Sequence, residues 1–285
     1  MKNIALLLCA AATVWGQAPA PPFSKQYLKV QQYTQEEDLR LIKLFEGLRV
    51  TDVMDGLDVA GLQDITMMDR DIRPLWRDEQ KFTHRIYGVA FTVRLAPAQV
   101  TAPKFASHAD ERPWEAEWYK SQGDYAPLVR PGTVLVVDNG ARDDGFCGSN
   151  MGLALFGQGL RGFVGNEVCR DSDEMILSRI PVYQGGYGLR SPRGINPGRM
   201  WVESYNQPVT VGHVLVMPGD IIVADTDGVA VVPRAKAEQV ANISRWIHDD
   251  DQVKRRKIFD RIGRPPDWTV EHVKEPPPPS KDPIQ

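Results

Sequence analysis

The sequence predicts one globular α/β domain, and three observations support this. The 285 residues, 42% hydrophobic and 25% charged, are enough to bury a sizeable core. An apolar strand, Val134–Val137, is followed by a glycine-rich loop and helix from Cys147 to about Phe156 and by a second strand, Gly162–Val168. This order is that of a βαβ crossover. Short apolar runs separated by turn residues then predict a β-meander of Val214–Met217, Ile221–Ala224 and Val229–Val232.

The remaining elements follow from periodicity and capping. Apolar residues at helical spacing predict a helix over Thr34–Leu48, and a shorter helix is expected to begin with Thr51 as its N-cap and to end at Gly61. We expect a strand at Ile86–Val93 and a helix from Ala235 to Arg256. The polar and aromatic stretch between Ala102 and Val129 predicts a helix that carries Trp114, Trp118 and Tyr119.

The N-terminus has the pattern of a secretory signal. Lys2 precedes an apolar run, Ile4–Val14, and a small-residue cleavage pattern ends at Gly16. The run is about eleven residues long, whereas a spanning helix needs roughly 20. We therefore expect residues 1–16 to be a signal peptide and the protein to be exported, periplasmic or secreted, with no stable membrane span after cleavage. An uncleaved interfacial anchor is the alternative.

The expected organisation of the rest is simple. Residues 17–33 are a linker, residues 34–256 the domain, and residues 257–285 a polar, proline-rich tail whose end we expect to be disordered or extended. The formal net charge of -3 gives no overall attraction to nucleic acid. Small molecules and protein subunits are therefore the expected partners.

Two cysteines remain after removal of the signal. Cys147 and Cys169 are compatible with one disulfide in an oxidising compartment, although their spacing does not decide this. They are a poor zinc site, because zinc takes four tetrahedral ligands or three and a water. The glycines from Gly157 to Gly162 match a dinucleotide fingerprint by letter, but they close a helix instead of opening one.

The segment that carries chemistry runs from Asp138 to Asp171. Gly148, Ser149, Asn150 and Met151 stand where a loop becomes a helix, so their backbone N–H groups could hold a carboxylate. The next strand ends at Arg170-Asp171. A guanidinium can grip a carboxylate or keto oxygen, and a carboxylate can hold a hard cation. The alternative is an ordinary surface ion pair at the end of a strand.

These segments resemble the RraA-like family, which includes 4-hydroxy-4-methyl-2-oxoglutarate aldolases with oxaloacetate decarboxylase activity and the regulator of ribonuclease activity A. The order and spacing of the matches, between roughly residues 45 and 245, carry the resemblance. The matching segments are Thr51–Leu57, Gly88–Val93, Pro131–Asp138, Gly148–Gly152, Gly159–Val164, Arg170-Asp171, Pro181–Tyr183, Pro218–Asp225 and Asp227–Pro233.

The resemblance implies a compact fold of the swivelling β/β/α type and a homotrimer or hexamer. It implies a lyase that uses Mg²⁺ or Mn²⁺ to cleave a carbon–carbon bond in a small 2-oxo acid, by aldol cleavage or by oxaloacetate decarboxylation, releasing pyruvate. Gly148, Ser149, Asn150 and Met151 would bind the substrate together with Arg170. Arg170 and Asp171 would be catalytic, with Asp171 as the metal ligand.

One residue departs from the family pattern. Aldolases of the family usually carry an acidic residue where this chain has Ser149, so Asp143 or Asp144 compensates, the metal site is weaker, or the reaction differs. A non-catalytic binding protein, as in the ribonuclease regulator, is the alternative function. A demethylmenaquinone methyltransferase is disfavoured, because the chain has no glycine-rich strand-loop-helix site for a methyl donor.

Overall fold

The computed structural model describes residues 33–98, 103–123, 126–140, 144–185, 193–194 and 199–273. The predicted signal peptide, the linker apart from Tyr33, and the proline-rich end of the tail lie outside the described residues. Within the described part of the chain, no helix is both long enough and apolar enough to cross a membrane.

The main sheet has eight strands among the described residues. Seven follow the order β1-β6-β5-β3-β2-β11-β12, and β8 pairs with the far half of β2. Neighbours among β2, β3, β5 and β6 are parallel, whereas β11 and β12 form an antiparallel hairpin. The bounds are β1 Arg73–Pro74, β2 Ile86–Pro97, β3 Thr133–Asp138, β5 Gly162–Gly165, β6 Val182–Gln184, β8 Met200–Tyr205, β11 Ile221–Asp225 and β12 Gly228–Val232.

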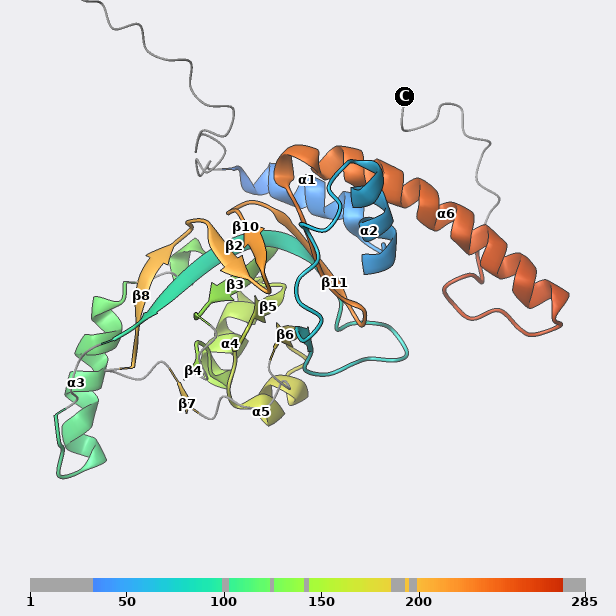
Figure 1. Ribbon diagram of the computed structural model, residues 1–285. Helices are drawn as coiled ribbons and strands as arrows, with labels where there is room; N and C mark the ends of the chain where they lie inside the picture. The colour runs from blue at the N-terminus through green and yellow to red at the C-terminus, as the bar shows by residue number, and fades with distance from the viewer. Residues whose placement is uncertain are drawn as a thin grey trace, which may run out of the picture.

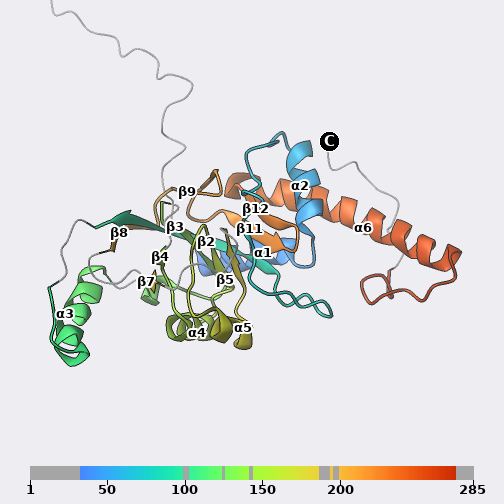
Figure 2. The same ribbon diagram turned by 60° about the horizontal axis from the view of Figure 1, so that its bottom comes forward.

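The helices gather in groups around this sheet (Figure 1). α4 (Ser149–Gly157) connects β3 to β5, and α5 (Ser172–Leu177) connects β5 to β6, which confirms the predicted crossover. α1 (Gln35–Phe45), α2 (Val50–Val59) and α6 (Ala237–Arg261) pack on the part of the sheet formed by β2, β11 and β12. α3 (His108–Ser121) projects from the body beside β8, as both views show (Figure 2).

The central residues of β3 and β11 are apolar because both faces of these strands are buried. In β3, Val134 and Val136 point into the core inside the curved sheet, whereas Leu135 and Val137 point toward α4 and α5. β11 behaves in the same way, since Ile222 faces the inner core and the residues on either side face α1, α2 and α6. A continuous apolar run is therefore the expected pattern for these strands.

Further pairing nearly closes the sheet into a barrel. The Met68 N–H donates to Val229 O at 3.0 Å and the Val231 N–H donates to Thr66 O at 2.8 Å, so the segment after α2 covers the outer edge of β12. The hairpin of β9 (Val209–Val211) and β10 (Val214–Val216) packs its valines into the inner core. A small parallel pair, β4 (Asp144–Gly145) and β7 (Arg193–Gly194), lies outside the main sheet. The predicted single α/β domain of the swivelling β/β/α type is confirmed.

The predicted β-meander is wrong for its first strand. Val214–Val216 pairs with β9 and not with β11. Between them the chain turns at Pro218-Gly219-Asp220, where Gly219 N–H donates to Ala90 O and Ala90 N–H donates to Asp220 O. These bonds direct the chain onto β2, so that β11 lies between β2 and β12 in the main sheet.

Several boundaries also differ from the prediction. β2 continues past Val93 to Pro97 because its second half pairs with β8. The strand predicted to reach Val168 ends at Gly165, and α6 continues five residues beyond Arg256 to Arg261. The helix predicted over Thr34–Leu48 runs from Gln35 to Phe45, with Thr34 as its N-cap, and ends close to the left-handed Gly47 (φ 84°).

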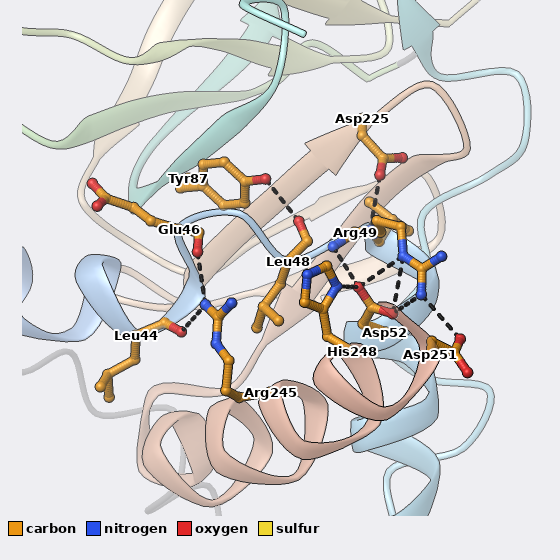
Figure 3. Close-up of polar contacts among 11 residues, drawn as sticks. Leu44, Glu46, Leu48, Arg49, Asp52, Tyr87, Asp225, Arg245, His248 and Asp251 are labelled. Atoms are coloured by element: carbon orange, nitrogen blue, oxygen red, sulfur yellow. Dashed lines mark hydrogen bonds and ion pairs between the residues drawn. The ribbon is translucent and has the colours of Figure 1, made fainter. Parts of the chain in front are cut away.

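The predicted N-cap Thr51 is wrong, because the second helix begins at Val50 and its N-cap lies two residues before Thr51. Arg49 is the N-cap, and its N–H donates to the carboxylate of Asp52 at 2.8 Å while its guanidinium also bonds that carboxylate. His248 of α6 lies 2.8 Å from Asp52 Oδ2, and Asp251 lies 3.1 Å from the Arg49 guanidinium (Figure 3). The Asp52 side chain is only 1% exposed, so these contacts satisfy a buried charge.

The same region ties the first two helices to the rest of the domain. The Val50 N–H donates to Asp225 Oδ2 at 2.9 Å, which connects the start of α2 to the end of β11. The Tyr87 hydroxyl donates to Leu48 O at 2.7 Å, and Arg245 of α6 donates to Glu46 O at 2.7 Å. Figure 3 shows all of these contacts converging on the short link between α1 and α2.

We predict that Asp52→Ala lowers the free energy of unfolding by about 2–3 kcal/mol, because it removes several charge-assisted hydrogen bonds and leaves Arg49 and His248 without their shared anion. Urea denaturation at neutral pH measures the difference. Asp58→Ala, on the exposed side of the same helix, is the matched control and should change the value by less than about 0.5 kcal/mol.

The contribution of Asp52 also has a defined pH dependence. The hydrogen bonds from His248 and Arg49 outweigh burial and lower the pKa of Asp52 well below its usual range. Its stabilising effect is therefore complete above the unfolded pKa of about 3.9 and is lost as the pH falls toward the folded value. The gap in stability between the parent and Asp52→Ala should narrow below about pH 4; an unchanged gap would contradict this account.

Candidate active site

The beginning of α4 supplies free backbone donors. Gly148 is the N-cap in an extended conformation (φ -96°, ψ 172°) and has no side chain with which to cap the helix. The first intrahelical bond is from Gly152 N–H to Gly148 O at 2.9 Å. The N–H groups of the first turn therefore point out of the helix, where the positive end of the helix dipole favours an anion.

Asp171 provides that anion from another part of the chain. Its Oδ2 accepts hydrogen bonds from Ser149 N–H at 3.0 Å and from the Ser149 hydroxyl at 3.4 Å. Asp171 is the N-cap residue of α5, but its side chain makes no capping hydrogen bond there and its backbone is left-handed (φ 58°, ψ 48°). Aspartate is among the few residues that adopt this conformation at modest cost. A Cβ on Gly148 would lie 2.7 Å from Asp171 Oδ2, so a larger residue here would have to displace this carboxylate.

Arg170 lies next to this carboxylate and remains accessible. Its Nε is 3.9 Å from Asp171 Oδ1, and the two side chains are 38% and 39% exposed. The structure thus brings Gly148, Ser149, Arg170 and Asp171 together, as the sequence predicted for their positions. Asn150 is exposed on the first turn of α4, whereas the Met151 side chain is partly buried and packs against the core.

Two buried side-chain amides, which the sequence did not predict as part of the site, hold the Arg170-Asp171 segment in place. Gln184 Oε1 at the end of β6 accepts hydrogen bonds from Val168 N–H at 3.2 Å and Cys169 N–H at 2.9 Å. Asn139 Nδ2 donates to Glu167 O at 2.7 Å. Gln184 is the last residue of a buried strand and Asn139 directly follows one, and these positions were the available signal in the sequence.

The two cysteines sit directly beneath the site. Cys147 and Cys169 form a parallel β-bridge, with Cys147 N–H donating to Val168 O at 3.0 Å and Arg170 N–H donating to Cys147 O at 2.9 Å. Both are buried free thiols. Burial and a hydrogen bond with Cys147 raise the pKa of Cys169 well above its usual value.

α3 carries Tyr119, whose hydroxyl is influenced by the charge of Arg170. Burial and the charge of Glu115 raise the pKa of Tyr119, and the charge of Arg170 lowers it in part. α3 is anchored by Trp118, whose ring stacks on Trp201 of β8 at 4.7 Å between centroids. The sequence placed Tyr119 on a helix but gave no reason to place it near Arg170.

The donors around Asp171 fit a weakly held, well-hydrated divalent ion. Among the described residues, no three His, Cys, Asp or Glu side chains gather where they could hold a metal ion. Asp144, which the sequence suggested as a substitute for the missing acid, is 1% exposed and lies 3.9 Å from Arg199, while Asp143 lies outside the described residues. Mg²⁺ is often bound through one or two carboxylates with water completing its shell, and Asp171 with the Ser149 hydroxyl meets that lower limit.

A separate hollow of about 490 Å³ opens at the carboxyl ends of β3 and β5. Its lining includes several acids and one histidine, namely Asp69, Asp71, Asp138, Glu167 and His213. A surface with this much negative charge repels a carboxylate substrate. Arg170 therefore offers the better location for an anionic ligand.

Comparison with known proteins identifies the family of the chain. The sequence matches the RraA-like family, described as Aldolase/RraA, over residues 50–231. The chain belongs to the RraA-like family. The matched range contains the Gly148–Met151 loop, Arg170 and Asp171.

Individual relatives share less than 30% sequence identity with this chain. The chain is 27% identical, over 80% of its own length and 92% of the relative's, to a protein of Halalkalibacterium halodurans named "Putative 4-hydroxy-4-methyl-2-oxoglutarate aldolase". The fold is similar to that of Streptomyces coelicolor RraAS2, a member of the RNase ES inhibitor RraA family (TM-score 0.58, 22% identity, 81% of this chain and 98% of that one). It is also similar to an uncharacterised protein of Pseudomonas syringae (TM-score 0.60, 22% identity, 80% and 94%).

We predict that Gln184→Leu destabilises the protein by about 2–4 kcal/mol, because it leaves the buried N–H groups of Val168 and Cys169 without their acceptor. Guanidinium denaturation followed by circular dichroism measures the change. Gln158→Leu, an exposed glutamine at the end of α4, is the matched control. Equal stability of the two variants would show that Gln184 does not hold this segment.

Proposed function

We propose that this protein is a divalent-metal-dependent lyase that cleaves a carbon–carbon bond in a small 2-oxo acid. The observation that carries the proposal is the accessible Arg170 guanidinium 3.9 Å from a carboxylate fixed at the amide end of α4. The aldolase name of the Halalkalibacterium halodurans relative supports the same class of reaction.

Arg170 is the residue that would bind the substrate. Its guanidinium can donate two parallel hydrogen bonds to the substrate carboxylate or to the keto oxygen. The Ser149 N–H is already engaged by Asp171, so the first-turn donors left for the substrate are the N–H groups of Asn150 and Met151. These contacts would fix the bond to be broken relative to Asp171.

Asp171 would hold Mg²⁺ or Mn²⁺ through the oxygen that Ser149 does not occupy. When bound, the ion would supply Lewis-acid stabilisation of the negative charge that develops on the keto oxygen. Arg170 would share that charge from its own side of the site. The left-handed backbone of Asp171 and the close fit of Gly148 keep the carboxylate in this position before substrate arrives.

We also propose that the protein is exported and that it forms a homotrimer or hexamer. Export rests on the signal-like sequence of residues 1–16. Oligomerisation is supported by large exposed apolar side chains on the outer surfaces of α4 and α5 beside the site, namely Leu153, Phe156 and Leu177.

The direct test is pyruvate release from oxaloacetate or from a 4-hydroxy-2-oxo acid, with added Mg²⁺ or with EDTA. We expect EDTA to abolish turnover and Arg170→Ala to lower kcat/KM by about 10²–10³-fold, because a guanidinium that stabilises the developing charge is lost. Arg161→Ala, an exposed arginine before β5, should behave as the parent does.

Two outcomes would contradict the lyase proposal. Turnover that continues in EDTA would rule out the metal-dependent mechanism, and full activity of Arg170→Ala would remove Arg170 from it. A protein that turns over neither type of substrate but binds a protein partner tightly would instead match the regulatory branch of the family.

Ser149→Asp tests the metal site separately from catalysis. A second carboxylate beside Asp171 should tighten Mn²⁺ binding by about tenfold or more, since affinity for hard cations rises with the number of charged ligands. Isothermal titration with Mn²⁺ measures the affinity. Ser149→Asn, which adds similar bulk without charge, is the control and should leave the affinity at or below that of the parent.

A further inference from the structure

The two cysteines beneath the site are placed as a disulfide-forming pair. Their backbones are directly opposite one another in a parallel bridge, since Cys147 bonds to both neighbours of Cys169. Adjacent strands lie about 4.8 Å apart, which falls within the Cα separation of about 4.4–6.8 Å that disulfides need.

The side chains meet this requirement as well as the backbones. Both belong to the same core cluster, between α4, α5 and the sheet, so they leave the bridge on the same face. They are 0% and 1% exposed, and the two thiols interact with one another. The usual spacing of adjacent strands is therefore compatible with a bond between the two sulfur atoms.

A disulfide between the two cysteines would affect the candidate site, because each cysteine directly precedes one half of it. Cys147 is followed directly by Gly148 and Ser149, and Cys169 is followed directly by Arg170 and Asp171. Hydrogen bonds between the backbones and from Ser149 to Asp171, together with side-chain packing, join these two segments. A bond between the sulfurs would make the connection covalent, one residue away from both halves of the site.

We propose that Cys147 and Cys169 form a disulfide that covalently joins the α4 loop to the Arg170-Asp171 segment. The proposal does not depend on the lyase activity. Export, if it occurs as proposed, would bring the pair into an oxidising compartment, where such bonds persist. Under reducing conditions the same two thiols stay in hydrogen-bonding contact and the fold is retained.

The reaction is a thiol–disulfide exchange with a disulfide oxidant, for which oxidised glutathione is the probe. One cysteine sulfur attacks the glutathione disulfide and releases one glutathione thiol, and the second cysteine sulfur then displaces the other. The sulfur–sulfur bond of the protein forms as that of the oxidant breaks. The two protons and two electrons lost by the cysteines appear in the two molecules of reduced glutathione.

Two samples of the full chain are used so that glutathione can react with the buried thiols. One is unfolded with reductant and refolded in a mixture of oxidised and reduced glutathione, and the other is kept folded in the same mixture with urea below the unfolding midpoint. After acid quenching, free thiols are alkylated and peptides are mapped by mass spectrometry. We expect a single cross-link, between Cys147 and Cys169, in each sample whose circular dichroism spectrum is that of the native protein.

Thermal unfolding provides the second readout. Closing a loop of about 20 residues should raise the Tm of the oxidised protein by on the order of 10 °C relative to the same protein with reductant. A Cys147→Ala/Cys169→Ala variant is the matched control, because its Tm should not respond to reductant. The comparison of oxidised and reduced parent protein needs no variant, so a poorly folded control does not affect the conclusion.

Three results would overturn the proposal. Free thiols at both positions in both samples would show that the pair does not oxidise. Glutathione adducts on either cysteine, or a cross-link from Cys9 to either of them, would show that the geometry does not favour this bond. A cross-link that left Tm unchanged would remove the proposed connection between the two segments.

Discussion

The contact between the Asp171 carboxylate and the amide end of α4 is the interaction on which the candidate site depends. It joins two segments that come from different strands, and it caps a helix whose own N-cap, Gly148, has no side chain. Two unusual backbone features make it possible. Asp171 adopts a left-handed conformation that turns its carboxylate away from α5, and Gly148 leaves the space that the carboxylate needs.

This contact gives Asp171 and Arg170 different roles in the site. Because Asp171 already engages the first donor of α4, a substrate carboxylate has to find its principal positive partner elsewhere, and Arg170 is the accessible cation beside it. The amide end of the helix then acts mainly to hold Asp171 in place. The buried amides of Gln184 and Asn139 hold the same segment from below, so the site is fixed before any ligand binds.

Stability and function draw on different parts of the domain. The buried network around Asp52 joins α2, α6 and β11 on the outer surface of one half of the sheet (Figure 3). The candidate site lies on the other half, where α4 and α5 pack (Figure 1). A substitution in the Asp52 network should therefore act on folding with little direct effect on the chemistry, because distant sites with no shared contacts behave additively.

Ser149 is the position at which the chain departs from the family pattern, and its surroundings give that departure a physical meaning. Its hydroxyl and N–H both face Asp171, so the site has one carboxylate where a typical aldolase of the family has two. A single carboxylate holds a divalent ion less tightly and leaves more of its shell to water or to substrate. For the proposed lyase, this means that the metal would be retained mainly when substrate is also bound.

The sequence by itself determined the α/β class, the βαβ crossover at the site and the local placement of Gly148, Ser149, Arg170 and Asp171, because these depend on short-range periodicity, turn chemistry and order along the chain. Tertiary structure decided the rest. Val214–Val216 pairs with β9 instead of β11, Arg49 replaces Thr51 as N-cap, and Gln184 supports a segment from a neighbouring strand. Each of these depends on a partner that is distant in the sequence, and local patterns carry no information about which distant partner a backbone group will meet.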